Sequence, residues 1–238
     1  MAANNHNFSL IIPCFNESKN IPLLFDEIAI CQKKCLFEII IVNNGSTDNS
    51  KLIINDHKHK IQNFKLINID KNIGFGNGVK MGLLASSHNT VCYTHGDLQI
   101  KIENCLHAFE IYKRNSINSF IKSKRINRDL ISVFFTFFMG LYNTLLFRTF
   151  LKDIHSQPNL FSKPEENIIH NCPDDMGIDL YFYAFFKLKK YSILRFNVLF
   201  NKRVYGVGST DLLINKLSYA VKSLKNSLIT KKKFNEIL

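Results

Sequence analysis

The sequence lacks the features by which several classes of protein are recognised. It contains no internal repeat and no low-complexity linker, which excludes a repeat array and favours one domain of 238 residues. Of its six cysteines, Cys31 and Cys35 lie four positions apart, but no second such pair completes a zinc site. We therefore expect reduced, mostly buried thiols. Residues 1–7 have no signal-peptide apolar stretch, and we therefore expect the chain to begin in the cytosol.

Acidic side chains are scarce. The 19 aspartates and glutamates face 31 lysines and arginines, a formal net charge of +12 that indicates an anionic partner. Nucleic acid, anionic lipid and phosphorylated substrates all fit this charge. No nucleic-acid recognition motif is present and the aromatic residues lie mostly in apolar runs, so we do not expect nucleic acid as a partner. A hydrophobic fraction of 46% is typical of a globular protein and excludes a disordered chain.

Short apolar runs alternate with helical patterns through the first half of the chain. The runs at residues 8–12, 37–42, 64–69 and 90–94 predict strands, with helices between them. This alternation predicts an α/β fold with a parallel sheet. Ligands of such sheets bind outside the carboxyl ends of the strands, and polar or glycine-rich residues follow each of these runs.

Four segments carry a family resemblance when they are taken together. They are Pro-Cys-Phe-Asn-Glu at 13–17, Asn-Asn-Gly-Ser-Thr-Asp at 43–48, the glycine-rich turn at 72–78 and His-Gly-Asp-Leu-Gln at 95–99. In this order, on successive strands, they resemble glycosyltransferase family 2. The resemblance implies a GT-A fold, in which a single Rossmann-like domain has a mostly parallel central sheet and helices on both faces. It also implies a nucleotide diphosphate sugar as donor.

The resemblance assigns the donor nucleotide to the first strand ends. By the pattern of the family, Pro13, Phe15 and Glu17 line the nucleoside pocket, and Asn43 takes the position of an aspartate that reads the base. An amide both donates and accepts, so base reading is retained while the identity of the base stays open. A plain helix cap at Ser46 or Asp48 is compatible with this role. The remaining residues expected to bind the donor are Gly45, Ser46, Asn72, Gly78 and His95.

The metal motif departs from the family pattern. The family carries Asp-x-Asp where this chain has His95, Gly96 and Asp97. The resemblance implies that Asp97 binds Mg²⁺ or Mn²⁺ directly and that Gln99 also reaches the metal, since hard cations prefer oxygen ligands. We expect His95 outside the set of metal ligands. In catalysis the cation would offset charge on the leaving nucleotide diphosphate.

Basic residues in the second half resemble the phosphate-binding residues of polyprenyl-phosphate members. Lys122, Arg125 and Arg128 occupy the place of that basic cluster, while the segment from Arg203 to Ser209 resembles an Arg-x-x-Gly-x-Ser segment. The planar guanidinium of arginine suits phosphate because it donates two parallel hydrogen bonds. The resemblance also aligns residues 153–158 with an acidic residue and an acceptor-side turn.

A general base is needed only for one kind of acceptor. If the acceptor is a hydroxyl, Asp179, Asp174 or Asp175 must take its proton, whereas a phosphate acceptor is already an anion. We expect Asp97, Asp179 and Arg203 to be the catalytic set. Asp174 and Asp175 also fit a simple helix cap near Met176.

No charged residue occurs between positions 130 and 147. This stretch is close to the minimum length of a membrane span, but its polar residues favour a helix that lies in the membrane interface. An ordinary buried helix is the alternative. Residues 8–115 are expected to form the nucleotide-sugar half of a single domain spanning 1–238, residues 116–210 the acceptor half, and residues 211–238 a basic C-terminal helix.

The expected function is transfer of a sugar, with inversion, to a membrane-associated acceptor. Polyprenyl phosphate is the first choice, and a hydroxyl of a lipid-linked or surface glycan is the alternative. A non-catalytic subunit that binds a nucleotide sugar is the alternative of another class, because of His95 and Asn43. We expect the protein on the cytoplasmic face of an anionic membrane, as a peripheral protein.

Overall fold

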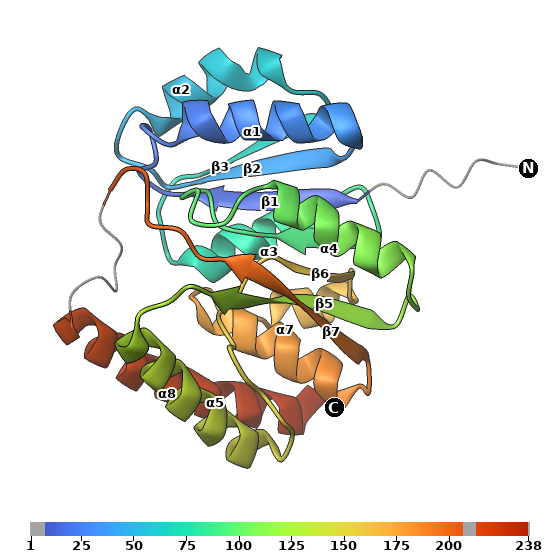
Figure 1. Ribbon diagram of the computed structural model, residues 1–238, viewed down its shortest axis with the longest axis vertical. Coiled ribbons are helices and arrows are strands. Elements are labelled where there is room, and N and C mark those ends of the chain that lie inside the picture. Colours follow the sequence, from blue (N-terminus) through green and yellow to red (C-terminus); the bar gives the residue numbers. More distant parts are fainter. Residues whose placement is uncertain (1–7, 207–212, 238) are drawn as a thin grey trace, which may run out of the picture.

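The computed structural model describes residues 8–206 and 213–237. Its strands form one seven-stranded sheet in the order β3-β2-β1-β4-β6-β5-β7, which runs through the whole molecule (Figure 1). Among the described strands, β6 alone runs antiparallel to its neighbours. The strands are β1 (Ser9–Cys14), β2 (Glu38–Asn44), β3 (Phe64–Ile69), β4 (Thr90–Tyr93), β5 (Ser119–Ile126), β6 (Asn159–Ser162) and β7 (Ser192–Leu199).

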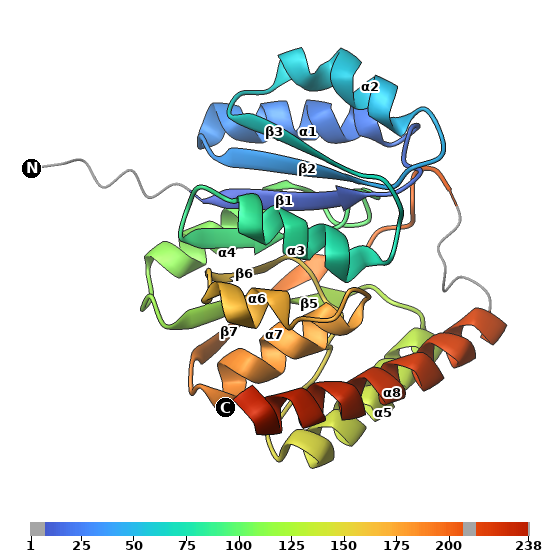
Figure 2. The ribbon, with the colours of Figure 1, turned by 180° about the vertical axis from the view of Figure 1, so that it is seen from behind.

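Helices cover both faces of this sheet. Figures 1 and 2 look at opposite faces, and each face has its own hydrophobic core. The first core is covered by α1 (Ile21–Lys34), α2 (Ser50–His57) with the 3-10 turn η1 (Lys58–Lys60), and α4 (Glu103–Lys113). The second core is covered by α3 (Phe75–Ala85), α6 (Glu166–His170) and α7 (Gly177–Leu188). The expected α/β domain with a mostly parallel sheet and helices on both faces is therefore confirmed.

The continuous apolar runs of the central strands follow from this layering. In β1, Leu10 and Ile12 face the first core while Ile11 faces the second, because successive side chains of a strand point to opposite faces. In β2, Ile40 faces the second core and Ile41 the first. A strand that is buried on both faces needs apolar residues at every position, and this explains the runs in the sequence.

Two helices lie side by side beyond the β7 end of the sheet: α5 (Leu130–Phe147) and α8 (Leu213–Ile237) (Figures 1 and 2). The side chain of Asp129 caps α5 by accepting the Ser132 N–H. By length and composition alone α5 could cross a membrane. Only 17% of it is buried within the protein. Exposed aliphatic and aromatic side chains make up its outer face, so α5 is not an ordinary buried helix.

Candidate functional site

The loops that follow β1 and β2 are joined by hydrogen bonds at the carboxyl edge of the sheet. The Asn16 N–H donates to Ser46 Oγ at 3.1 Å, and the Thr47 N–H donates to Asn16 Oδ1 at 2.8 Å. The Glu17 N–H donates to Ser50 Oγ at 3.0 Å. Parallel pairing places both strand ends at one edge, so residues thirty positions apart in sequence form one polar surface.

Asn43 is the penultimate residue of β2 at this edge, and only one of its two side-chain polar atoms has a hydrogen-bond partner. Its Nδ2 donates to Asn68 Oδ1 at 3.0 Å, and the residue is 5% exposed. The side-chain oxygen Oδ1 is buried and has no hydrogen-bond partner among the described residues. A buried acceptor left without a donor costs about 1–3 kcal/mol. The site is therefore suited to a ligand that donates a hydrogen bond here.

Close packing and one hydrogen bond account for the presence of Gly45, Gly78 and Asn72, three of the residues predicted to bind the donor. Gly45 has φ +73°, and a Cβ at this position would lie 2.3 Å from the Asn72 nitrogen. A Cβ on Gly78 would lie 2.8 Å from the Pro13 Cβ. The Gly74 N–H donates to Asn72 Oδ1 at 2.8 Å and fixes the turn before α3. These residues bring the loops together and leave no room for larger side chains.

Asp97 is paired with an arginine that comes from far along the chain. It is 4% exposed, its Oδ2 lies 2.8 Å from Arg203 Nη2, and its Oδ1 accepts the Gln99 N–H at 3.1 Å. Arg203 Nη1 also lies 3.5 Å from Glu17 Oε1. Burial is the largest cause of the raised pKa of Glu17, and the nearby Asp97 carboxylate raises it further. One guanidinium thus bridges carboxylates from the β1 and β4 strand ends.

His95 lies beside this pair as a neutral ring. Burial lowers its pKa because it disfavours the imidazolium, although the Asp97 charge acts in the opposite direction. Its ring centroid is 4.5 Å from that of Phe75. His95 therefore contributes a polar but uncharged wall where the family carries a carboxylate.

The oxygen atoms near Asp97 fit a divalent cation only in part. The Asp97 carboxylate and the Gln99 side-chain amide supply hard oxygen ligands. Over residues 8–206 and 213–237, no group of three or more histidine, cysteine, aspartate or glutamate side chains could hold a metal by itself. The residues therefore fit a cation that completes its shell with water and substrate phosphates, as Mg²⁺ often does.

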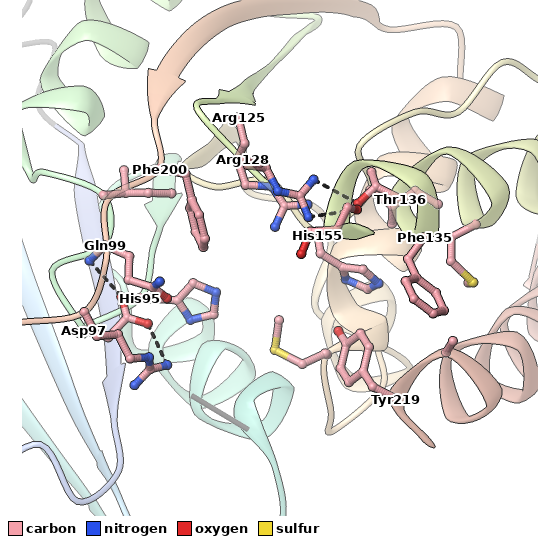
Figure 3. Close-up of a pocket in the computed structure, with 17 residues that line it drawn as sticks. His95, Asp97, Gln99, Arg125, Arg128, Phe135, Thr136, His155, Phe200 and Tyr219 are labelled. Atoms are coloured by element: carbon pink, nitrogen blue, oxygen red, sulfur yellow. Dashed lines mark hydrogen bonds and ion pairs between the residues drawn. The ribbon is translucent and has the colours of Figure 1, made fainter. Parts of the chain in front are cut away.

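A cavity of about 220 Å³ opens beside Asp97 (Figure 3). Its walls come from the β4 strand end, the end of β5, α5, the segment before β6, and α8. We call it the pocket; the lining residues used below are His95, Asp97, Gln99, Arg125, Arg128, Phe135, Thr136, Met139, His155, Arg203 and Tyr219.

Two arginines at the end of β5 supply positive charge to the pocket. Arg125 donates from Nε to Asp153 Oδ1 at 3.0 Å. Burial, together with the charge of the neighbouring Arg125, lowers the pKa of Arg128 to about 10. Arg128 donates from Nη1 to Thr136 Oγ1 at 2.9 Å. Burial alone would raise the pKa of Asp153, but the charge and hydrogen bonds of Arg125 outweigh it and lower that pKa. Both cations are thus held in place before any ligand arrives.

Several predicted residues lie outside the pocket lining. Lys122 is fully buried and donates to Ser156 O and Asn159 Oδ1, both at 2.9 Å, and burial lowers its pKa to about 7. Asp174 forms a surface ion pair with Lys80. Asp175 Oδ1 accepts the Gly177 N–H at 2.9 Å, which is the helix-cap alternative stated above. Ser209 lies outside the described residues.

Asp179 is also completely buried, behind the pocket wall. Its carboxylate accepts from Tyr93 OH at 2.8 Å and from Gln157 and Asn159 at 3.2 Å each. His155 Nδ1 lies 3.4 Å from Asp179 Oδ2. Sequence reasoning did not select His155, although it belongs to the 153–158 segment that the family resemblance aligned. The structure places this histidine, and not Asp179, on the pocket wall.

Comparison with known proteins gives a family and two kinds of relative. The family model for glycosyl transferase family 2 matches residues 9–143. A dolichyl-phosphate beta-glucosyltransferase of Trichomonas vaginalis is 32% identical over 102 residues, covering 40% of this chain and 30% of the relative. A poly-beta-1,6-N-acetyl-D-glucosamine synthase of Staphylococcus epidermidis is 30% identical over 107 residues, covering 45% and 26%. The chain thus spans about a third or less of these relatives.

Solved structures share the fold across almost the whole chain. Glucosyl-3-phosphoglycerate synthase of Mycobacterium tuberculosis superposes with a TM-score of 0.72 at 15% identity, covering 95% of this chain and 80% of that one. Another structure of that enzyme, with Mn²⁺, UDP and glucosyl-3-phosphoglycerate, gives a TM-score of 0.69 at 14% identity, over 94% and 79%. At such identity the likeness concerns the fold, which is the expected GT-A fold.

Proposed function

The chain belongs to glycosyltransferase family 2, and on this basis we propose that it transfers a sugar from a nucleotide diphosphate sugar to polyprenyl phosphate. The observation that carries the proposal is the pocket itself. Asp97 and Arg203, on the donor side, share one cavity with Arg125, Arg128 and the apolar side chains of α5. A lipid phosphate needs cations for its head and apolar surface for its chain, and both are present in this cavity.

The donor nucleotide would lie across the joined β1 and β2 loops. The unpartnered Asn43 Oδ1 supports this position, because a base with an N–H group would supply the missing donor. The Phe15 ring is 43% exposed at the same edge and offers a surface against which a base or ribose would pack. The Mycobacterium tuberculosis relative was crystallised with UDP, which favours a uridine donor.

We further propose that Asp97 and Gln99 would hold Mg²⁺ or Mn²⁺ together with the donor diphosphate. When bound, such a cation offsets the charge that builds on the leaving diphosphate. Arg203 now neutralises Asp97 at 2.8 Å, and we expect it to turn toward the phosphates when they arrive. The Mn²⁺ in the crystals of the Mycobacterium tuberculosis relative supports a divalent cation here.

Arg125 and Arg128 are the proposed contacts of the acceptor phosphate. Arg125 lies at the end of β5, Arg128 lies two residues beyond that strand, and α5 begins at Leu130. The apolar side chains of Phe135 and Met139 continue the wall from the arginines along the helix. Curated relatives that act on dolichyl phosphate support an acceptor of this class. We expect direct attack of the acceptor oxygen on the anomeric carbon, and hence inversion.

The outer face of α5 is the proposed membrane contact. Phe134, Phe137 and Phe138 are 60%, 64% and 49% exposed on this face, and Arg148 follows at the end of the helix. Aromatic rings beside cations are typical of helices that lie in the interface of an anionic membrane. The pocket and this face belong to the same helix, so a membrane acceptor would enter from the lipid. We expect a peripheral protein of the cytoplasmic leaflet.

A transfer assay tests the proposed function. Purified protein is mixed with anionic lipid vesicles, Mn²⁺ and a panel of radiolabelled nucleotide sugars. Polyprenyl phosphate is compared with a lipid-linked glycan that offers only hydroxyl groups. The expected result is labelled polyprenyl-phosphate sugar of inverted configuration. Labelling of the glycan alone would favour the hydroxyl alternative, and donor binding with no transfer to either would favour a non-catalytic subunit.

A further inference from the structure

His155 is a pocket residue to which the proposed function has not yet given a role. It belongs to the segment between α5 and β6, and its side chain is 17% exposed. In Figure 3 its imidazole lies among Phe135, Tyr219 and Arg128, inside the ring of lining residues. The donor-side residues Asp97 and Gln99 form another part of the same lining. A histidine in this position would face an acceptor that enters along α5.

The carboxylate behind His155 is built to stay ionised. Asp179 is fully buried, yet Tyr93 and the two side-chain amides of Gln157 and Asn159 donate to its oxygens. Burial alone would raise its pKa, but the contact with His155 and the charge of Lys122 lower that pKa. A buried carboxylate with this many donors and no solvent contact serves the residues around it, because it cannot reach a substrate itself.

The two ring nitrogens of His155 have different surroundings. Its Nδ1 is buried, lies 3.4 Å from Asp179 Oδ2, and has no other partner among the described residues. This distance is long for a hydrogen bond, as such contacts often are before a substrate binds. The Nε2 lies 3.5 Å from Ser223 Oγ of α8, a weak contact that a ligand could replace. The geometry favours a proton on Nδ1 and a lone pair on Nε2.

We propose, on the basis of the proposed sugar transfer, that His155 is the catalytic residue that receives the proton when the acceptor offers a hydroxyl, and that Asp179 is its positioning residue. The hydroxyl oxygen forms a bond to the anomeric carbon while its proton passes to His155 Nε2. The bond from the anomeric carbon to the diphosphate oxygen breaks, and its electron pair leaves with the nucleoside diphosphate. Polyprenyl phosphate is already an anion and attacks without this proton transfer.

The charged and titratable groups around His155 come from three parts of the chain. Asp179 of α7 lies behind the ring and stabilises the imidazolium once it forms. Arg125 and Arg128, from the end of β5, line the pocket and oppose a second positive charge. Tyr219 of α8 packs edge-on with ring centroids 5.6 Å apart, and burial raises its pKa well above the usual range. Tyr219 therefore remains neutral and does not compete for the proton.

The test compares His155→Ala and Asp179→Asn with His107→Gln, an exposed histidine of α4, as the control. Transfer is measured at about pH 7 with the hydroxyl acceptor and with polyprenyl phosphate. With the hydroxyl acceptor we expect kcat of His155→Ala to fall by about 10²–10⁴-fold while the Kd for the donor nucleotide stays unchanged, and with polyprenyl phosphate we expect kcat to change little. Asp179→Asn should lose activity in the same assay, and the control should keep it.

Chemical rescue separates proton transfer from a structural role. Added imidazole should restore part of the activity of His155→Ala, and the rescue should increase with pH as free imidazole loses its proton. Activity of His155→Ala within about twofold of wild type on the hydroxyl acceptor, a loss that imidazole does not relieve, or transfer by the wild type to polyprenyl phosphate alone, would overturn the inference. Failure of the wild-type protein to transfer sugar to either acceptor would instead overturn the proposed function.

Discussion

At the scale of single residues, the donor side of the pocket depends on an ion pair that a substrate must rearrange. Arg203 bridges Asp97 and Glu17, so the carboxylate expected to hold a cation already has a positive partner. Arginine and metal cannot both occupy the same carboxylate oxygen. The cation should therefore bind well only when phosphates are present to replace Asp97 as the partner of Arg203.

Substitution of Arg203 should change the binding of the metal ion and the binding of the nucleotide in opposite directions. Arg203→Gln removes the competing charge, so binding of Mn²⁺ alone should tighten, while the affinity for nucleoside diphosphate should fall about one to two decades through loss of a charge-assisted contact. Electron paramagnetic resonance of free Mn²⁺ measures the first effect and calorimetry the second. Asp97→Asn should abolish the effect of Mn²⁺ on nucleotide binding. Equal Mn²⁺ affinity in wild type and Arg203→Gln would contradict the competition.

Lys122 makes stability depend on pH. Its pKa falls from 10.5 to about 7 in the folded chain because burial penalises the charge, so between these values the unfolded chain binds the extra proton. The free energy of unfolding should therefore rise as pH increases from about 7 toward 10. Urea unfolding at pH 7 and pH 9 should show this rise in wild type and a smaller one in Lys122→Met. The same slope in both proteins would mean that Lys122 keeps its ordinary pKa.

At the scale of elements, the proposed function assigns acceptor binding and membrane contact to two sides of α5. Phe135 and Met139 face the pocket, while Phe134, Phe137 and Phe138 point outward. A helix with an unburied apolar face of this size would be a liability unless lipid or another molecule covers it.

Removal of the outer rings should release the protein from membranes. Burying an aromatic side chain stabilises by about 1.5–3 kcal/mol, so replacing Phe134, Phe137 and Phe138 together by Ser should weaken vesicle binding by well over tenfold. Leu52→Ser, at an equally exposed position of α2, is the control. Cosedimentation with anionic vesicles measures the binding. Unchanged sedimentation of the triple variant would show that α5 is not the membrane contact.

The elements that sequence could predict are those that local pattern determines. The runs that predicted β1, β2 and β4 are buried on both faces, whereas the run of β3, at the edge of the sheet, is half-buried. Helix α5 has the predicted limits because Asp129 and Arg148 bound an uncharged stretch. The strands β5, β6 and β7 were not predicted. β6 has only four residues and exists through antiparallel pairing with β4 and β5, which no local pattern encodes. Lys122 was therefore expected in a phosphate-binding basic cluster, although it lies within β5 and is buried.

At the scale of the whole molecule, the pocket assembles segments that are far apart in the chain. Strand-end reasoning located Asp97 and Gln99, because the carboxyl ends of parallel strands share one edge. It could not place His155 or Tyr219, since their positions depend on how the segment before β6 and helix α8 pack at the far end of the sheet. The residues proposed to bind donor and acceptor thus meet only in the folded chain.

The central claim is that one cavity holds the donor diphosphate and the acceptor phosphate at separate groups. The most direct measurement is initial-rate kinetics of sugar transfer to polyprenyl phosphate by wild type and Arg128→Gln, with the donor Kd measured in parallel. Loss of one charge-assisted contact, about 1.5–3 kcal/mol, predicts a KM for polyprenyl phosphate raised about one to two decades with an unchanged donor Kd. Equal KM values in the two proteins, or a loss confined to donor binding, would contradict the account.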